Sequence, residues 1–232
     1  MSRAKSSASV DTKALRGAGR KAWWQNYTAS LKYALHVITH PFDGFWDLIH
    51  EKRGSMAAAH TFLFLFLLTR VLKLMLTSFQ FISAPVQHLN IFEEALSLLL
   101  PFLVLCLANW AMTTLFDGKG RFRDIYMAMC YALVPYILIQ LPMILVSNML
   151  TFEEGSIYSV LLTFSVIWCV FLVFIGLMEI HDYGPGKTLV FLVVTVVGAL
   201  VIIFLVLTFF SLLSDAIGYF VSLYREIVYR LY

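Results

Sequence analysis

The sequence predicts an all-α, polytopic membrane protein with five transmembrane helices and flanking amphipathic interfacial helices. Of its 232 residues, 60% are hydrophobic and only 13% are charged, whereas soluble domains average about 25% charged residues. Five apolar segments are each longer than the ~20 residues with which an α-helix crosses ~30 Å of hydrocarbon. This composition excludes an ordinary soluble enzyme, a disordered chain and a nucleic-acid-binding protein.

The five predicted spans are apolar nearly all round and lack the alternation of half-buried strands, which is typical of helices embedded in lipid. Pro101 in the second span, and Pro135 and Pro142 in the third, predict kinks because proline removes a backbone N–H donor. The spans cover residues 56–82, 95–116, 125–150, 157–180 and 189–214.

The first 55 residues are predicted to form a cytoplasmic tail, an interfacial helix and a linker. Residues 1–20 are rich in Ser, Ala, Lys and Arg, which favours disorder. In residues 21–39, apolar side chains recur at helical spacing, which predicts an amphipathic helix at the membrane–water interface or, alternatively, on a protein partner. His40-Pro41 ends this helix, and residues 42–55 are expected to form a short linker.

Residues 216–232 predict a second amphipathic helix, after a five-helix membrane domain of residues 56–215. Ile217 and Tyr224 belong to its apolar face, and Glu226 belongs to the opposite face. This helix is expected along the outer membrane interface, and docking on a partner subunit is the alternative.

Basic residues are unevenly distributed along the chain. The segment before the first span carries nine of them, and the four loops between spans carry zero, three, zero and one in turn. The positive-inside rule therefore places the N-terminus and the second and fourth loops in the cytoplasm. Five spans then place the C-terminus outside, although Arg225 and Arg230 in that tail argue mildly against it.

The motifs of common enzymes and metal sites are missing from the sequence. Cys106, Cys130 and Cys169 each lie inside an apolar run, which favours small buried hydrophobes over disulfides or zinc ligands. HExxH, GxSxG and P-loop spacings do not occur. We therefore expect no enzymatic activity, no cofactor and no metal.

A polar cluster lies at the cytoplasmic end of the fourth span and consists of Glu179, His181 and Asp182. It could bind a cation, and it is the one cluster that could serve a lipid-active enzyme. Ion pairing with Lys187 or with the basic second loop is the favoured interpretation.

Charged residues within the first span are candidates for function, because isolated charges are costly in lipid. Arg70 and Lys73 lie near the outer leaflet. Snorkelling to headgroups is the first-ranked interpretation, a pair with Glu93 or Glu94 is the second, and a pair with another subunit is the third. Asn109 in the second span predicts an interhelical hydrogen bond.

Three segments lie before the first span and at the second and fourth loops: they read HPFDGFWDLIHEKRGS from residue 40, LFDGKGRFRDIYMAMCYALVPYIL from residue 115 and GLMEIHDYGPGKT from residue 176. Together they resemble the Yip domain family, the Ypt/Rab-interacting multi-pass membrane proteins, and most closely its bacterial branch. The candidate partner-contact residues in them are His40, Pro41, Asp43, Trp46, Asp117, Lys119, Arg121, Arg123, Glu179, His181, Asp182 and Lys187.

The resemblance implies a five-span domain with a cytoplasmic N-terminus and with structural roles for Gly118, Gly120, Tyr131 and Pro135. Eukaryotic members look like trafficking factors that bind prenylated Rab GTPases. Bacterial members suggest an accessory subunit beside a carbohydrate ABC importer in the plasma membrane.

Taken together, the expected function is a non-enzymatic scaffold or accessory subunit, in contact with lipid and with permease subunits or a second copy. A small transporter, a lipid-moving or membrane-shaping protein, and a Rab-type trafficking factor are the alternatives.

Overall fold

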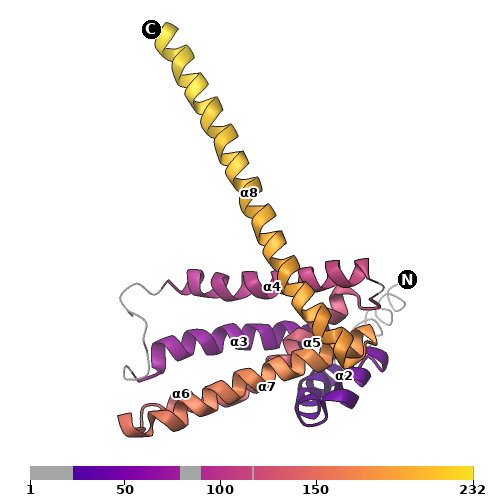
Figure 1. Ribbon diagram of the computed structural model, residues 1–232. Coiled ribbons are helices and arrows are strands. Elements are labelled where there is room, and N and C mark those ends of the chain that lie inside the picture. Colours follow the sequence, from indigo (N-terminus) through magenta and orange to yellow (C-terminus); the bar gives the residue numbers. More distant parts are fainter. Residues whose placement is uncertain (1–22, 79–89, 117, 232) are drawn as a thin grey trace, which may run out of the picture.

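The computed structural model describes residues 23–78, 90–116 and 118–231, and these residues form helices and connections without any strand. The expected disordered tail and Asp117 lie outside the described residues. The helices are residues 23–39, α2 (Pro41–His50), α3 (Met56–Leu76), α4 (Ile91–Leu115), α5 (Phe122–Ala132), α6 (Val134–Val146), the 3₁₀ turn η3 (Phe152–Glu154), α7 (Gly155–His181) and α8 (Pro185–Leu231) (Figure 1).

Five helical units in the described part of the chain are long and apolar enough to cross a membrane, which confirms the predicted fold class. They are α3, α4, α5 with α6, α7 and α8. Helix α3 packs against α4, α5 and α6, and α7 packs against α5 and α6, whereas α8 leaves the bundle at a steep angle (Figure 1).

The third span is interrupted at Leu133, between α5 and α6. Pro135 causes the interruption, because its missing N–H cannot continue the α-helical hydrogen bonds. The Leu133 N–H instead bonds to the Cys130 carbonyl in a tighter turn. The kink expected at Pro135 is therefore confirmed, whereas Pro101 and Pro142 lie within α4 and α6 without ending them.

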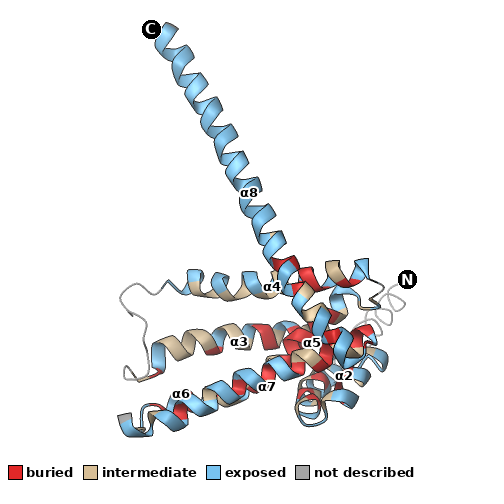
Figure 2. Cartoon of the chain, in the orientation of Figure 1, coloured by how far each residue is buried: buried red, intermediate tan, exposed pale blue. Residues whose placement is uncertain are grey.

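The core lies toward one end of the bundle, where the helix of residues 23–39, α2, α5 and parts of α3 and α7 meet (Figure 2). All eight residues from Ile125 to Ala132 of α5 are buried. Val37, Phe45 and Leu48 are fully buried although their helices lie outside the predicted spans. Their burial removes apolar surface from water, so the hydrophobic effect stabilises this end directly.

Residues 42–55 are not simply a linker, because most of them belong to α2. Pro41 occupies the first turn, where its fixed φ suits a helix and its missing N–H costs nothing. Asp43 lies in the first turn, where the positive end of the helix dipole stabilises its negative charge. The prediction of a linker was wrong because a short helix held by tertiary packing has a weak local signal.

The helix of residues 23–39 packs against α2. A Cβ on Gly44 would come within 2.8 Å of the Val37 Cα, so glycine permits this close approach. The Tyr33 hydroxyl bonds to the Gly44 carbonyl and the Asp47 carboxylate, both at 3.2 Å. Trp23 and Trp24 remain about half exposed, as expected of residues that face an interface.

The expected C-terminal amphipathic helix of residues 216–232 is not a separate element, because α8 runs without interruption through residue 215 to Leu231. No proline stands in residues 186–231, and Gly218 alone weakens a helix without ending it. The first part of α8 packs on α4, whereas described residues 203–230 are all exposed (Figure 2).

Candidate functional site

The three segments that resemble the Yip domain family meet at one end of the bundle. Helix α2 packs against α7 and α5, and the connection before α5 contacts the end of α7. We call this region the motif end and define it as residues 40–55, 118–124 and 181–188. Most of the candidate contact residues therefore lie together, as the sequence predicts.

An ion pair joins two of these segments at the surface. The Lys119 Nζ lies 2.8 Å from the Asp182 Oδ2. The hydrogen bond from Lys119 holds the pKa of the Asp182 carboxyl below its usual range and raises the pKa of the Lys119 ammonium. This is the pairing with the second loop that the sequence favours over a cation site. Asp182 has a φ of 56° and ends α7 in the left-handed conformation.

A buried chain of hydrogen bonds lies beneath this ion pair. The Gly120 N–H donates to the His181 Nδ1 at 3.2 Å, and the His181 Nε2 lies 3.1 Å from the Asn109 Oδ1. The Asn109 Nδ2 donates to the Thr195 Oγ1 at 3.0 Å. The Thr195 hydroxyl donates to the Phe191 carbonyl at 2.7 Å. The chain thus connects the 118–120 loop with α4, α7 and α8.

The direction of every bond in this chain follows from its first donor. A backbone N–H can only donate, so the His181 Nδ1 must accept. The proton of a neutral imidazole then resides on Nε2, which donates to the Asn109 carbonyl oxygen. His181 is only 2% exposed and Asn109 also 2%, so water does not replace these bonds. The interhelical role expected of Asn109 is confirmed.

Gly120 is required by the same packing. A Cβ at this position would lie 2.5 Å from the Ile180 Cγ2 and 2.6 Å from the His181 Cε1. The loop therefore approaches α7 as closely as its backbone allows. This explains in steric terms the structural role that the family resemblance implies for Gly120.

The Glu179, His181 and Asp182 side chains do not converge on one point. His181 bonds inward to Asn109 and Asp182 bonds outward to Lys119. Glu179 and Asp182 both line a polar cavity of about 160 Å³, together with residues of α2 and the 118–124 segment, whereas His181 does not. Among the described residues, no group of three or more His, Cys, Asp or Glu side chains is placed to hold a metal ion.

The remaining candidates of the motif end have individual surroundings. The Lys187 Nζ lies 3.9 Å from the centre of the Tyr183 ring, a cation–π contact. The Trp46 and His50 rings stack, with their centres 3.7 Å apart. His40 bonds to Thr39, Pro41 begins α2, Arg121 is the N-cap of α5, and Asp43 and Arg123 are exposed.

Sequence reasoning did not single out Ser30, which helps to attach the N-terminal helix. Its hydroxyl donates to the Arg53 carbonyl at 2.9 Å, and its carbonyl accepts from the Tyr131 hydroxyl at 3.3 Å. The Ser55 N–H also donates to the Tyr131 hydroxyl. Tyr131 is fully buried, and it holds residues 30 and 55 beside α5. A serine between apolar positions gives no signal of such a contact.

Arg70 and Lys73 lie away from the motif end. The Arg70 Nε bonds to the Glu94 Oε1 at 2.7 Å and so joins α3 to α4. The first-ranked interpretation, snorkelling, is therefore replaced by the second-ranked ion pair. A partner on the neighbouring helix neutralises the charge where water is scarce. Lys73 has no ion pair among the described residues.

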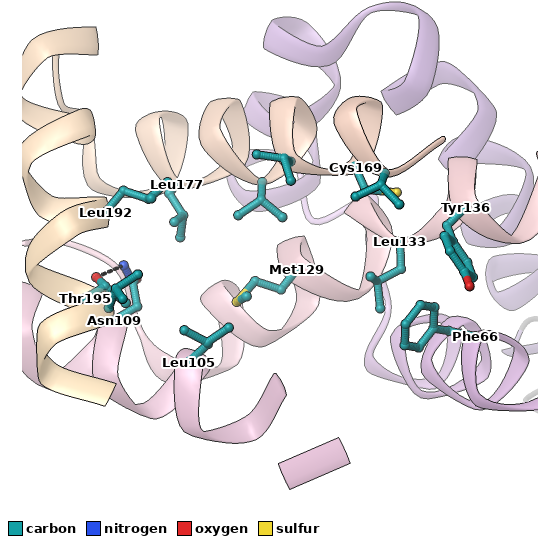
Figure 3. Close-up of a pocket in the computed structure, with 14 residues that line it drawn as sticks. Phe66, Leu105, Asn109, Met129, Leu133, Tyr136, Cys169, Leu177, Leu192 and Thr195 are labelled. Carbon is teal, nitrogen blue, oxygen red and sulfur yellow. Dashed lines mark hydrogen bonds between the residues drawn. The ribbon is translucent and has the colours of Figure 1, made fainter. Parts of the chain in front are cut away.

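An apolar cavity of about 380 Å³ lies between the spanning helices (Figure 3). Phe66 and Tyr136 stand at one side of it, and the bonded pair Asn109 and Thr195 stands at the other (Figure 3). Its walls are almost entirely hydrocarbon, which suits an apolar chain and not an ion or a sugar. No sequence pattern predicts this cavity, because it depends on how five helices fit together.

These features define a multi-pass α-helical membrane protein with a structured polar end. A family model described as the Yip1 domain matches residues 35–208, which is well over half of the chain. The chain therefore belongs to the Yip1 family. The match begins within the helix of residues 23–39 and ends within α8, so it includes the whole motif end. Comparisons with curated proteins and with solved structures found no match.

Proposed function

We propose that this Yip1-family protein is a non-enzymatic scaffold or accessory subunit that binds a membrane-protein partner through its motif end. The observation that carries the proposal is the buried chain from Gly120 through His181 to Asn109. It fixes the 118–120 loop on three spanning helices. Exposed charges on either side of the loop are thereby presented on a rigid surface.

A rigid, charged surface of this kind suits protein recognition. Pre-organised groups lose little conformational freedom on binding, and exposed charges of both signs favour a particular partner and orientation. Asp43, Lys119, Arg123 and Asp182 provide such charges at the motif end. The proposed partner is a transporter permease subunit, such as that of a carbohydrate ABC importer, and a second copy of this chain is the alternative.

The proposed location is a bacterial plasma membrane with the motif end in the cytoplasm. The basic N-terminal segment and the basic second loop support this orientation. Arg123→Cys at the motif end and Glu153→Cys at the opposite end provide exposed labelling sites, while the three native cysteines are buried. In intact cells, an impermeant maleimide should label only Glu153→Cys. Labelling of only Arg123→Cys would show that the motif end faces the outside.

Site-specific photocrosslinking in native membranes tests the partner. A crosslinking amino acid at position 123 should capture one membrane protein, identified by mass spectrometry, and the same group at position 153 should not. Arg123→Glu should reduce co-purification of that protein in mild detergent, while Glu153→Lys should not. A solitary monomer without crosslinks, or equal capture at both positions, would contradict the proposal.

Lipid movement is the second candidate function, and the apolar cavity of Figure 3 favours it over ion or sugar transport. Val170 lines this cavity and is also half exposed at the bundle surface. Reconstituted vesicles should then exchange fluorescent lipid between leaflets, and Val170→Trp should slow the exchange. Vesicles with no exchange above the protein-free rate would eliminate this candidate.

A further inference from the structure

A second polar cavity, separate from the hydrogen-bonded chain at His181, lies where the N-terminal helix meets the start of α3. Its volume is about 650 Å³. One wall is aromatic and includes Trp23 and Tyr27, whose rings stack in parallel at 5.4 Å. The other wall is the connection between α2 and α3, with Lys52 and Arg53.

The cavity lies at the depth of lipid headgroups. Residues 51–55 are polar and the apolar run of α3 begins at Met56, so the cavity borders the point where the first span leaves the hydrocarbon. Trp23 is half exposed beside it, and tryptophan favours this level of a bilayer. Lipid phosphates are therefore the anions that occur beside the cavity at the highest concentration.

One cation of the cavity is free to meet an anion. The described lining contains two cations, Lys52 and Arg53, and one carboxylate, Glu51. The Arg53 guanidinium already pairs with two carboxylates, because its Nη2 lies 2.6 Å from Glu51 and its Nη1 lies 3.5 Å from Asp47. Lys52 has no ion pair among the described residues, so its ammonium is available to a ligand.

The backbone of Lys52 is unusual for a lysine. Its φ is 55°, in the left-handed region that glycine adopts at no steric cost. The position follows the last turn of α2, where the Glu51 and Arg53 N–H groups both point to the Asp47 carbonyl. Helices usually end on glycine at this point. Lysine at this position carries a steric cost that glycine would avoid.

We propose that this cavity binds the phosphate of a membrane phospholipid, with Lys52 and Arg53 at the phosphate and Trp23 and Tyr27 against the glycerol and the first acyl carbons. The site combines a cationic wall, an aromatic wall and an opening at headgroup depth. Its cationic wall belongs to the 40–55 segment of the motif end, whereas Arg123 is not part of its lining.

Native mass spectrometry of the full-length protein in detergent tests this site with three probes. Phosphatidylglycerol carries phosphate and chains, diacylglycerol carries chains only, and glycerol phosphate carries the headgroup only. The wild type should bind one phosphatidylglycerol more tightly than either other probe. Equal binding of diacylglycerol would show that phosphate is not recognised, and equal binding of glycerol phosphate would show a site for soluble phosphates. Either result overturns the proposal.

Substitutions at Lys52 separate binding from folding. Lys52→Gly removes the charge and relieves the left-handed strain, so its melting temperature should equal or exceed that of the wild type. Its affinity for phosphatidylglycerol should fall about fivefold, as expected for the loss of one cation near a membrane surface. Lys52→Gln should weaken binding similarly. Lys32→Ala removes an exposed lysine outside the cavity and should leave binding unchanged. Equal losses at positions 32 and 52, or none at 52, would refute the assignment.

Discussion

Replacing Asn109 by leucine should destabilise the bundle more than any single hydrogen bond between spans would suggest. Asn109 accepts from the His181 Nε2 and donates to the Thr195 hydroxyl. Leucine has the same number of side-chain heavy atoms in the same branched arrangement, so the substitution removes both bonds without leaving a cavity. The Nε2–H of His181 would remain buried and unpaired, because the Gly120 N–H still holds the other ring nitrogen.

The magnitude follows from the two unequal bonds. An unpaired buried donor costs about 1–3 kcal/mol, which applies to His181. A hydrogen bond between membrane helices averages about 0.6 kcal/mol, which applies to Thr195, whose hydroxyl keeps its bond to Phe191. Asn109→Leu should therefore lower the free energy of unfolding by about 2–3 kcal/mol. Thr195→Val leaves the buried Asn109 Nδ2 without its acceptor, so it should lower the free energy of unfolding by about 1–3 kcal/mol.

Unfolding of the purified protein in mixed micelles, with increasing denaturing detergent, measures both values. The double variant Asn109→Leu with Thr195→Val should be about as stable as Asn109→Leu alone, since the second bond is already lost. Fully additive losses in the double variant would refute the idea of one hydrogen-bonded chain that runs from Gly120 through His181 and Asn109 to Thr195.

Three further predictions concern other contacts. Gly120→Ala should destabilise the protein because the added methyl group has no room, whereas Gly184→Ala has open space around it and should be neutral. The same unfolding measurement compares the two variants, and equal effects would contradict the packing. Arg70→Met should destabilise by about 1–3 kcal/mol, because it leaves the partly buried Glu94 carboxylate without its partner. Exchanging the charges as Arg70→Glu with Glu94→Arg should restore part of the loss, and no recovery would argue against direct pairing. Burial, together with a nearby carboxylate, raises the pKa of Tyr33 from 10 to about 12. The contribution of the protonated Tyr33 hydroxyl to the free energy of unfolding should be complete below pH 10 and lost as the pH rises through about 12. Ultraviolet difference titration against Tyr33→Phe measures this, and ionisation near pH 10 would disprove it.

The spans were predictable because lipid imposes a strong constraint on composition. The interruption of the third span was predictable because Pro135 cannot donate a backbone hydrogen bond. The association of the motif segments also followed, since loops on one side of a short-looped bundle must lie near one another. The predicted pairing of the Asp182 region with the second loop required only opposite charges at that end.

Other features depend on three-dimensional fit and could not be derived from the sequence. The orientation of His181 is decided by a backbone N–H that only a glycine brings close enough. Helix α2 is stabilised by the burial of Phe45 and Leu48 in the core, and its own sequence carries only a weak helical signal. The partner of Arg70 was chosen by the packing of α3 on α4, which the sequence alone leaves open between lipid and protein.

The length of α8 has a mechanical consequence. Its 47 residues extend about 70 Å as an α-helix, more than twice the hydrocarbon thickness. An unbroken rod of this length acts as a lever whose fulcrum is the contact with α4. The exposed part beyond that contact, residues 203–230, is about 42 Å long, so a change of about 10° in its angle would move the distal end by about 7 Å. Small rearrangements where α8 crosses α4 are thus amplified far from the bundle.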